Sequence, residues 1–364
     1  MSESLQLEVS DFDAVNELYH AKGWTDGLPI VPPTPEKVAR FLEAAGLTAD
    51  HQIGYYEERQ IPVHAEKLAI NAVMAGCLPE YFPVVVAIIE AMLDHDFPTH
   101  VVNTSTGSFT VGFIVNGPVR HRLGMNFHGN VLGPGNRANA SIGRAVRLIQ
   151  INTLASIAGA GGEPHAHGRP KLDRSMMGQP AKYTGYHIVE NEEAFPSLLP
   201  VHVERGFAPE DSTVTLLFVG GYKWICAHSD GTPDEWIDTM AHYVVGGGFM
   251  QPLGIGGAAT ILMPPENAEL FVRAGWTKAN IRDALFERTR RSVEWIKREG
   301  YKVQMQRGRL EEVAQGDADS FMAISGSASP DDLLIVPCGG PAGAWPYYLH
   351  GGMKAVTRRI GAPG

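Results

Sequence analysis

The residues with the clearest chemical potential lie in one stretch, residues 126–157. Its first part is rich in glycine and asparagine, whereas its second part has the spacing of a largely apolar helix. A polar loop that runs into a buried helix directs unpaired backbone N–H groups and the positive end of the helix dipole at one point. The pattern predicts a cage for a small anion or carboxylate, built from Asn126, Asn130, Asn136, Arg137 and Asn139.

A second interpretation of the same stretch stays open. Asparagine side chains cap turns and glycine tolerates positive φ, so the stretch is also typical of an irregular loop. Two expected strand ends, near Asn103 and Asn116, could converge on it. The turn after the first of them holds small hydroxyl residues, so we expect Asn103, Ser105 and Thr106 to help bind the substrate.

Several residues are candidates for acid–base chemistry. Glu190 is the first residue after an expected strand over residues 183–189, where burial would raise its pKa and suit it to act as a general base. His64 and His128 are further candidates for proton transfer. Glu190 also begins an acidic run with Glu192 and Glu193, which is typical of a solvated turn.

Cys338 is a candidate nucleophile. It stands where an expected strand over residues 333–336 meets a glycine-rich loop, whose backbone donors would stabilise a thiolate and lower its pKa. The alternative is that Cys338 only packs, as most buried free cysteines do. The chain has three cysteines and no C-x-x-C pair, so a disulfide framework is not expected.

A metal site is suggested by the pair His165 and His167. In an extended segment an H-x-H pair places both imidazoles on one side, so a divalent metal ion is a candidate cofactor. Further ligands would come from His64, His128, Asp173 or His187. The same pair lies between a proline and a glycine and is equally typical of an exposed loop.

The elements that must position these residues indicate an α/β fold in two halves. In the first half we expect helices over residues 11–22, 35–45, 64–75 and 80–93, and strands over 52–56, 100–103 and 111–115. In the second half, strands alternate with helices, which predicts a mainly parallel sheet with ligands outside its carboxyl edge. Gly220, Pro264 and Cys338 would stand on that edge.

A long loop rich in glycine, proline and histidine separates the two halves. It shows no hydrophobic periodicity, and loops of this length in compact proteins are usually functional or mobile. The sequence therefore predicts an N-terminal α/β half over residues 1–158, a linker or lid over residues 159–182, and a C-terminal α/β half over residues 183–364.

Composition narrows the class of partner. The 364 residues have a formal net charge of −10, and the basic residues are scattered, which argues against nucleic acid or an anionic membrane as the main partner. There is no apolar stretch of the length that a membrane span requires, and the acidic first residues do not resemble a signal peptide. We expect a cytoplasmic protein that binds a small molecule and forms a homo-oligomer.

Five segments together resemble a bacterial family of mostly hypothetical proteins. They are WTDGLPIVPPT at residues 24–34, NAVMAGCLPEYFPVV at 71–85, NGP at 116–118, LGPGNRANA at 132–140 and HVERGFAPEDSTVT at 202–215. Members of that family are similar to partners of small UGSC-type thiol or selenol proteins. The resemblance implies common ancestry and a UGSC-type thiol protein as a partner, although the UGSC tetrapeptide itself is absent from this chain.

Two hypotheses for the function follow. The first is an enzyme, a hydrolase or lyase, that acts on a small anionic or carboxylate-bearing substrate by acid–base hydrolysis, hydration or elimination, with or without a divalent metal. Preorganised amide and guanidinium donors suit this chemistry because they stabilise charge that develops on a substrate oxygen. The second hypothesis is a non-catalytic binding or scaffold protein that serves a thiol or selenol redox protein.

Overall fold

The computed structural model describes residues 11–155, 173–226, 231–247, 259–292, 321–323, 330–341 and 343–361. Its helices are α1 (Phe12–Ala21), α2 (Pro35–Ala45), α3 (Ala65–Met74), α4 (Phe82–Met92), α5 (Thr99–Thr104), α6 (Val119–Arg122), α7 (Arg137–Asn152), α8 (Val201–Glu204), α9 (Pro233–Gly247), α10 (Pro265–Arg273) and α11 (Lys278–Arg288). Its strands are β1 (Gln52–Tyr56), β2 (Ile61–His64), β3 (Thr110–Asn116), β4 (Tyr186–Val189), β5 (Thr213–Trp224), β6 (Ala259–Met263), β7 (Arg290–Ser292), β8 (Phe321–Ala323), β9 (Leu333–Pro337), β10 (Tyr347–Gly351) and β11 (Val356–Arg359). None of the helices in these ranges has the length and apolar character of a bilayer-spanning segment.

Among the described residues, the largest sheet has seven strands and is mixed. Its order is β4-β3-β5-β10-β6-β9, with β11 beside the first part of β5. Only the β3–β4 and β6–β9 pairings of this sheet are parallel, and the others are antiparallel. The α/β class is confirmed, but the expected mainly parallel sheet is wrong. The reason is that β10, from the C-terminal part of the chain, inserts between β5 and β6 and runs antiparallel to both.

Strand β5 joins the two regions of this sheet. Its first part pairs with β3 and β11, and its second part pairs with β10 across a shift in register at His350. Gly221 makes room for that imidazole, because a Cβ on Gly221 would lie 2.6 Å from Nε2 of His350.

The sheet also crosses the boundary expected between the two halves, since β3 pairs with β4 and β5. The division at residues 158 and 182 stays a prediction, and residues 156–172 of the expected linker lie outside the described residues.

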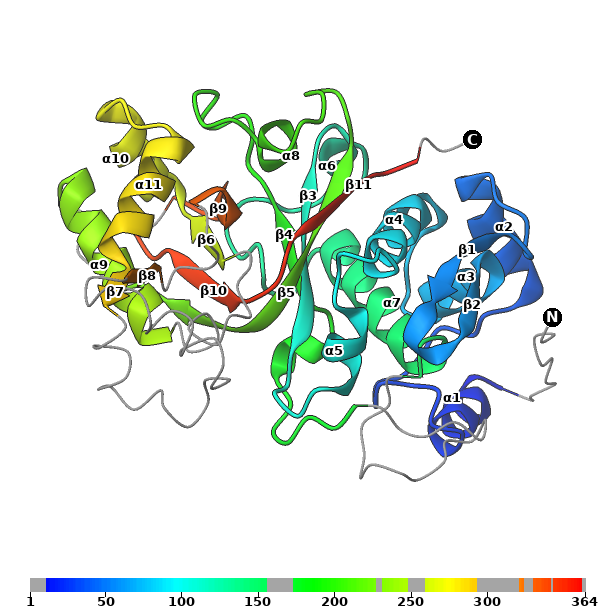
Figure 1. Ribbon diagram of the computed structural model, residues 1–364. Helices are drawn as coiled ribbons and strands as arrows, with labels where there is room; N and C mark the ends of the chain where they lie inside the picture. The colour runs from blue at the N-terminus through cyan, green and yellow to red at the C-terminus, as the bar shows by residue number, and fades with distance from the viewer. Residues whose placement is uncertain are drawn as a thin grey trace.

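Three apolar clusters pack against the sheet. Figure 1 shows the helices of the first two clusters, α2, α3, α4 and α7 and α9, α10 and α11, on opposite sides of the view. The first contains α2, α3, α4 and α7 and one face of β3, β5 and β11. The second contains α9, α10 and α11 against β6, β9 and β10. The third, which we call the central cluster, lies on the opposite faces of the same strands and includes Ile188, Val336 and Cys338. The carboxyl ends of β4 and β9 meet beside it, where the amide of Asn191 donates to the carbonyl of Pro337 at 2.8 Å.

Helix α7 has the amphipathic pattern that the sequence predicts. Its larger apolar residues are buried in the first cluster. Three of its polar side chains have partners on other segments. Arg144 forms an ion pair with Asp26 at 2.9 Å, Arg147 forms one with Asp173 at 3.2 Å, and Gln150 donates to Asn103 at 2.9 Å. The helix therefore links the segment between α1 and α2, helix α5 and the segment after residue 172.

One expected strand is instead a helix. The segment expected as a strand over residues 100–103 forms α5, in which His100 and Asn103 are three residues apart and lie on the same side. The His100 ring lies 3.1 Å from the hydroxyl of Tyr56, and Asn103 accepts the hydrogen bond from Gln150. An extended segment would point these two side chains to opposite sides, so tertiary contacts favour the helix.

Close packing between α7 and the turn before β4 gives a first prediction. A Cβ on Gly143 would lie 1.9 Å from the carbonyl oxygen of Thr184, which is backbone and cannot move freely. We expect Gly143→Ala to lower the free energy of unfolding by about 1–3 kcal/mol in urea denaturation. Gly246→Ala in α9 is the matched control, because its Cβ would meet only the Lys223 amine, at 4.0 Å. Equal stability of the two variants would show that the α7 contact is not tight.

Candidate functional site

The polar loop, residues 126–136, lies against the loop that follows β9. His128 forms a parallel bridge with Gly339, and the amide of Gly339 donates to the carbonyl of Phe127 at 3.0 Å. Val131 reaches from the polar loop into the central cluster, where Cys338 also packs. Two loops that the sequence singles out separately therefore form one surface at the carboxyl end of β9.

The asparagine side chains of the polar loop bind the loop itself. The carboxamide of Asn126 donates to Gly129 at 3.0 Å, and that of Asn130 donates to Pro134 at 2.7 Å. Asn136 is the N-cap of α7, where its side chain accepts from the amide of Asn139 at 3.0 Å. These are the capping roles of the second interpretation, so the carboxamides shape the loop.

The other two members of the expected cage are also occupied. Asn139 is buried, accepts from the amide of Asn126 at 3.0 Å and donates to the carbonyl of the same residue at 2.9 Å. Arg137 donates two hydrogen bonds, at 3.0 and 2.9 Å, to the carbonyl of Gly76 just after α3. The guanidinium therefore caps a neighbouring helix end, and an anion at the loop would be met mainly by backbone N–H groups.

The expected substrate-binding residues 103–106 lie at a different place. Asn103 faces Gln150 near the C-terminal end of α7, Ser105 accepts from the amide of Gly107, and Thr106 accepts from the amide of Met176. At a rise of 1.5 Å per residue, Gln150 is about 20 Å along the helix from its first residue. The two groups of predicted binding residues therefore cannot hold the same small molecule.

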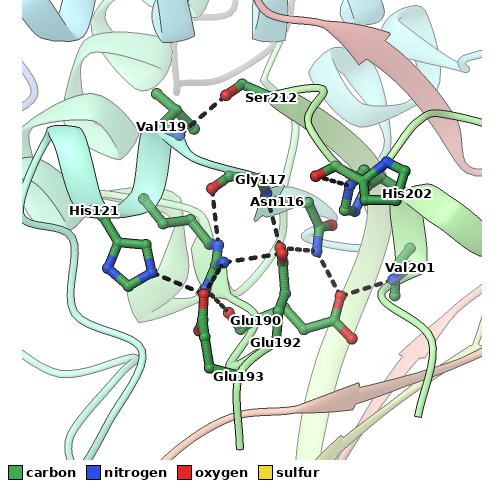
Figure 2. Close-up of polar contacts among 12 residues, drawn as sticks. Asn116, Gly117, Val119, His121, Glu190, Glu192, Glu193, Val201, His202 and Ser212 are labelled. Carbon is green, nitrogen blue, oxygen red and sulfur yellow. Dashed lines mark hydrogen bonds and ion pairs between the residues drawn. The ribbon is translucent and has the colours of Figure 1, made fainter. Parts of the chain in front are cut away.

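Glu190 follows β4 as expected and is part of a buried ionic network (Figure 2). Its side chain is 1% exposed, and one oxygen lies 2.7 Å from the amine of Lys278. The other oxygen accepts from the carboxamide of Asn116 at 2.6 Å and from the amide of Val201 at 2.8 Å. These three donors, with the Lys278 amine among them, occupy both oxygens of a buried side chain, so a substrate has no access to this carboxylate.

Arg120 organises the next two carboxylates. Its buried guanidinium lies 2.9 Å from an oxygen of Glu192 and 2.8 Å from an oxygen of Glu193, and it donates to the carbonyl of Glu190 at 2.7 Å. Its carbon lies 5.3 Å from the centre of the Phe127 ring in the polar loop. The acidic run after β4 is therefore a built structure around one arginine, in contrast to the solvated turn of the alternative interpretation.

An exposed acid–base pair stands at the edge of this network. Nε2 of His121 lies 2.8 Å from the carboxylate of Glu193, and both side chains are more than half exposed. Burial raises the pKa of Glu193, but the hydrogen bonds from Arg120 and His121 outweigh it and lower the pKa to about 2. The His121 ring packs edge-on against Phe127, which also contacts the ring of His128. Two imidazoles therefore lie beside one phenyl ring at the polar loop.

The thiol of Cys338 is buried in the central cluster. Burial raises its pKa, and the negative charge of Glu190 raises it further. This is the opposite of the lowering that we expected, because apolar side chains surround the sulfur and outweigh the backbone donors of the glycine-rich loop. A thiol held in its neutral form packs well but reacts poorly.

The remaining histidine candidates lie elsewhere. His64 ends β2, where its ring contacts the carbonyl of Asp50 at 3.1 Å, and Figure 1 places β2 far from β9. His165 and His167 lie outside the described residues. Within the described part of the chain, no group of three His, Cys, Asp or Glu side chains is placed to hold a metal ion. The proposed divalent metal therefore has no ligand set among these residues.

Sequence reasoning missed Arg120, His121 and Lys278. The first two follow the Asn-Gly-Pro turn after β3, in a short basic segment with no recognisable motif. Lys278 opens α11 and lies 88 residues from Glu190 in sequence. A basic residue at a helix start carries no local signal of a buried partner, so only the folded chain reveals the pair.

We also compared the chain with known proteins. No protein-family model, curated protein or solved structure matches the chain.

The buried pair gives a prediction on stability. Lys278→Met leaves the Glu190 carboxylate buried without its amine, so we expect a loss of about 3–5 kcal/mol in the free energy of unfolding, measured by urea denaturation. Arg273→Met is the matched control, because it breaks an exposed ion pair with Glu269 and should cost at most about 1 kcal/mol. Similar losses in both variants would contradict a structural role for the buried pair.

The clamped carboxylate of Glu193 gives a prediction on pH dependence. Its pKa of about 2 is below the ordinary value of 4.5, so its stabilising contribution is complete above pH 4.5 and disappears as the pH falls toward 2. Glu193→Gln should therefore be less stable than the parent chain at pH 7, and the difference should shrink at lower pH. Urea denaturation between pH 7 and 3 measures this, with Glu17→Gln in α1 as an exposed control. A difference that is constant with pH would refute it.

Proposed function

We propose that the chain is an acid–base enzyme that acts on a small carboxylate-bearing compound at the surface of the polar loop. The observation on which the proposal rests is the exposed His121–Glu193 pair at 2.8 Å, clamped from the buried side by Arg120. A histidine oriented by a fixed carboxylate is a common arrangement for proton transfer near neutral pH. The reaction class would be hydration, elimination or hydrolysis.

The geometry favours His121 over Glu190 as the residue that moves the proton. Glu190 is 1% exposed and its two oxygens already have three donors. His121 is exposed, so a solute can reach its ring. Glu190 would instead support the site by holding the ends of β3 and β4 and the start of α11 together.

The hydrogen bond to Glu193 also sets the tautomer of His121. Because the low pKa of Glu193 keeps this carboxylate ionised, it can only accept, and Nε2 of His121 must carry the hydrogen. The other ring nitrogen, Nδ1, then has the free lone pair that takes a proton from a substrate carbon or from water. The charge that forms on the ring is stabilised by Glu193.

Recognition of the anion would come from groups that the polar loop leaves available. Gly135 has a φ of +122° and nothing within 4 Å of its Cβ direction, so a ligand can approach the backbone there. The N-terminus of α7 follows immediately, and the His128 imidazole adds positive charge when protonated. No step is assigned to a metal, because His165 and His167 lie outside the described residues.

One observation favours the alternative of a non-catalytic binding protein. Aromatic side chains are exposed on β5 and around β10, where Tyr222 stacks on Tyr347 at 5.3 Å and Trp224 stacks on Trp345 at 5.1 Å. Such residues are enriched at protein interfaces. We propose a UGSC-type thiol protein as the partner in that case. A stable complex that contains this partner, together with no turnover of small molecules, would favour the binding protein over the enzyme.

The enzyme proposal is tested by NMR in D₂O with a panel of small mono- and dicarboxylates. Catalysed exchange or conversion of at least one compound is expected, and His121→Asn should slow it by a factor of about 10²–10⁴ with little change in melting temperature. His95→Asn is the control, because His95 is also an exposed histidine beside a carboxylate, Asp96, but lies after α4. An unchanged rate in His121→Asn would eliminate this residue as the base.

A further inference from the structure

A second cluster with chemical potential lies near the C-terminal end of α7. The hydroxyl of Ser175 donates to the carboxylate of Asp173 at 2.6 Å, and the amine of Lys182 contacts the same hydroxyl. The Lys182 amine also binds both oxygens of Asp173, at 2.8 and 2.7 Å. Arg147 completes the cluster at 3.2 Å from Asp173. A hydroxyl, an amine within hydrogen-bond reach and a carboxylate that holds the amine form the arrangement of an activated nucleophile.

The charged side chains of this cluster are more buried than its hydroxyl. The side chain of Asp173 is 3% exposed, and those of Arg147 and Lys182 are each 12% exposed. Ser175 is half-buried, and the next residue, Met176, is 82% exposed. The charged groups are therefore shielded, whereas the hydroxyl lies at the boundary with solvent, where a substrate can reach it.

The turn that holds Ser175 is anchored on the turn after α5. The amide of Met176 donates to the carbonyl of Thr106 at 3.1 Å, the amide of Gly178 donates to the hydroxyl of Ser108 at 2.9 Å, and Arg174 donates to the carbonyl of Thr104 at 2.9 Å. These contacts fix the serine before any substrate arrives. They also explain where the predicted binding residues near position 105 belong, since they position this turn.

We propose that Ser175 is a nucleophile for acyl transfer from a small ester or thioester, with Lys182 as its base and Asp173 as the residue that positions Lys182. This is an activity separate from that of the His121–Glu193 pair. It uses only the described residues on the two turns and α7.

The chemical step is balanced within this cluster. In the resting cluster the Ser175 hydroxyl donates to Asp173, and the Lys182 amine donates to that hydroxyl. The reaction starts from the neutral amine, toward which the hydroxyl hydrogen rotates. The oxygen of Ser175 then bonds to the carbonyl carbon of the substrate while its proton passes to this amine. The bond to the leaving alkoxide or thiolate then breaks, and that group takes the proton from the lysine. Water attacks the acyl-serine with Lys182 again accepting the proton, which releases the acid and restores the serine.

The charges in the cluster suit these roles. Burial lowers the pKa of Lys182, and although Asp173 raises it, the positive charge of Arg147 lowers it again, so the net direction is down. Burial raises the pKa of Asp173, but hydrogen bonds from Lys182 and Ser175 bring it below its ordinary value. Asp173 therefore stays ionised beside Arg147, and Lys182 is more often in the neutral form that can accept a proton than a lysine in water is.

A turn-capping serine would show part of the same geometry, because the amide of Ser175 also donates to Asp173 at 3.1 Å. The contact with Lys182 distinguishes the two roles. A serine that only caps its turn has the reactivity of any other alcohol, whereas a serine beside a base reacts with electrophiles at neutral pH.

The test is labelling of the full chain with a fluorophosphonate probe, which bonds to the serine oxygen and releases fluoride. We expect mass spectrometry to locate the label on Ser175, with Ser175→Ala losing it and the exposed Ser197→Ala retaining it. Lys182→Arg is the decisive variant: it keeps the ion pair with Asp173 but cannot accept a proton. Its labelling should be at least about 10²-fold slower, with a melting temperature within a few degrees of the parent chain.

Two results would overturn the proposal. One is no label on Ser175 in the folded parent chain, and the other is a Lys182→Arg variant that labels at the parent rate. His121→Asn should label normally, which separates this activity from the one proposed at the polar loop.

Discussion

The fold depends on the hydrogen bonds and the ion pair that the buried Glu190 carboxylate makes with its neighbours. This side chain is 1% exposed at the end of β4, and a charge so deeply buried is stable only with a full set of partners. Its partners come from β3, α8 and α11, namely Asn116, Val201 and Lys278. Satisfying one carboxylate therefore requires that elements far apart along the chain meet. The same meeting places Arg120, Glu192 and Glu193 beside His121.

Helix α7 is the second constraint, because its two ends serve different surfaces. Its N-cap shapes the polar loop beside β9, and its last turns hold Arg147 and Gln150 toward α5 and the turn of Ser175. A buried helix of this length keeps the two places about 20 Å apart and rigid relative to each other. The chain therefore presents two separate polar surfaces on one scaffold.

The sequence pattern predicted those elements that depend on residues close together along the chain. The apolar helical pattern of α7 and the strand before Glu190 appear where the sequence places them. The asparagine side chains of the polar loop that the sequence assigned to an anion cage each bind a backbone group within a few residues. A carboxamide donates to a nearby backbone carbonyl as readily as it donates to a bound ligand. The sequence alone does not distinguish these two outcomes.

By itself the sequence determined the α/β class, the polar loop, the central helix and the position of the acidic run at a strand end. Those features follow from the spacing of residues that are close along the chain. Only the tertiary structure decided the mixed sheet, the burial of Cys338, and the pairing of Lys278 with Glu190 and of Lys182 with Ser175. The physical reason is that strand order and buried charge pairs depend on which distant segments meet, and local propensity does not encode that choice.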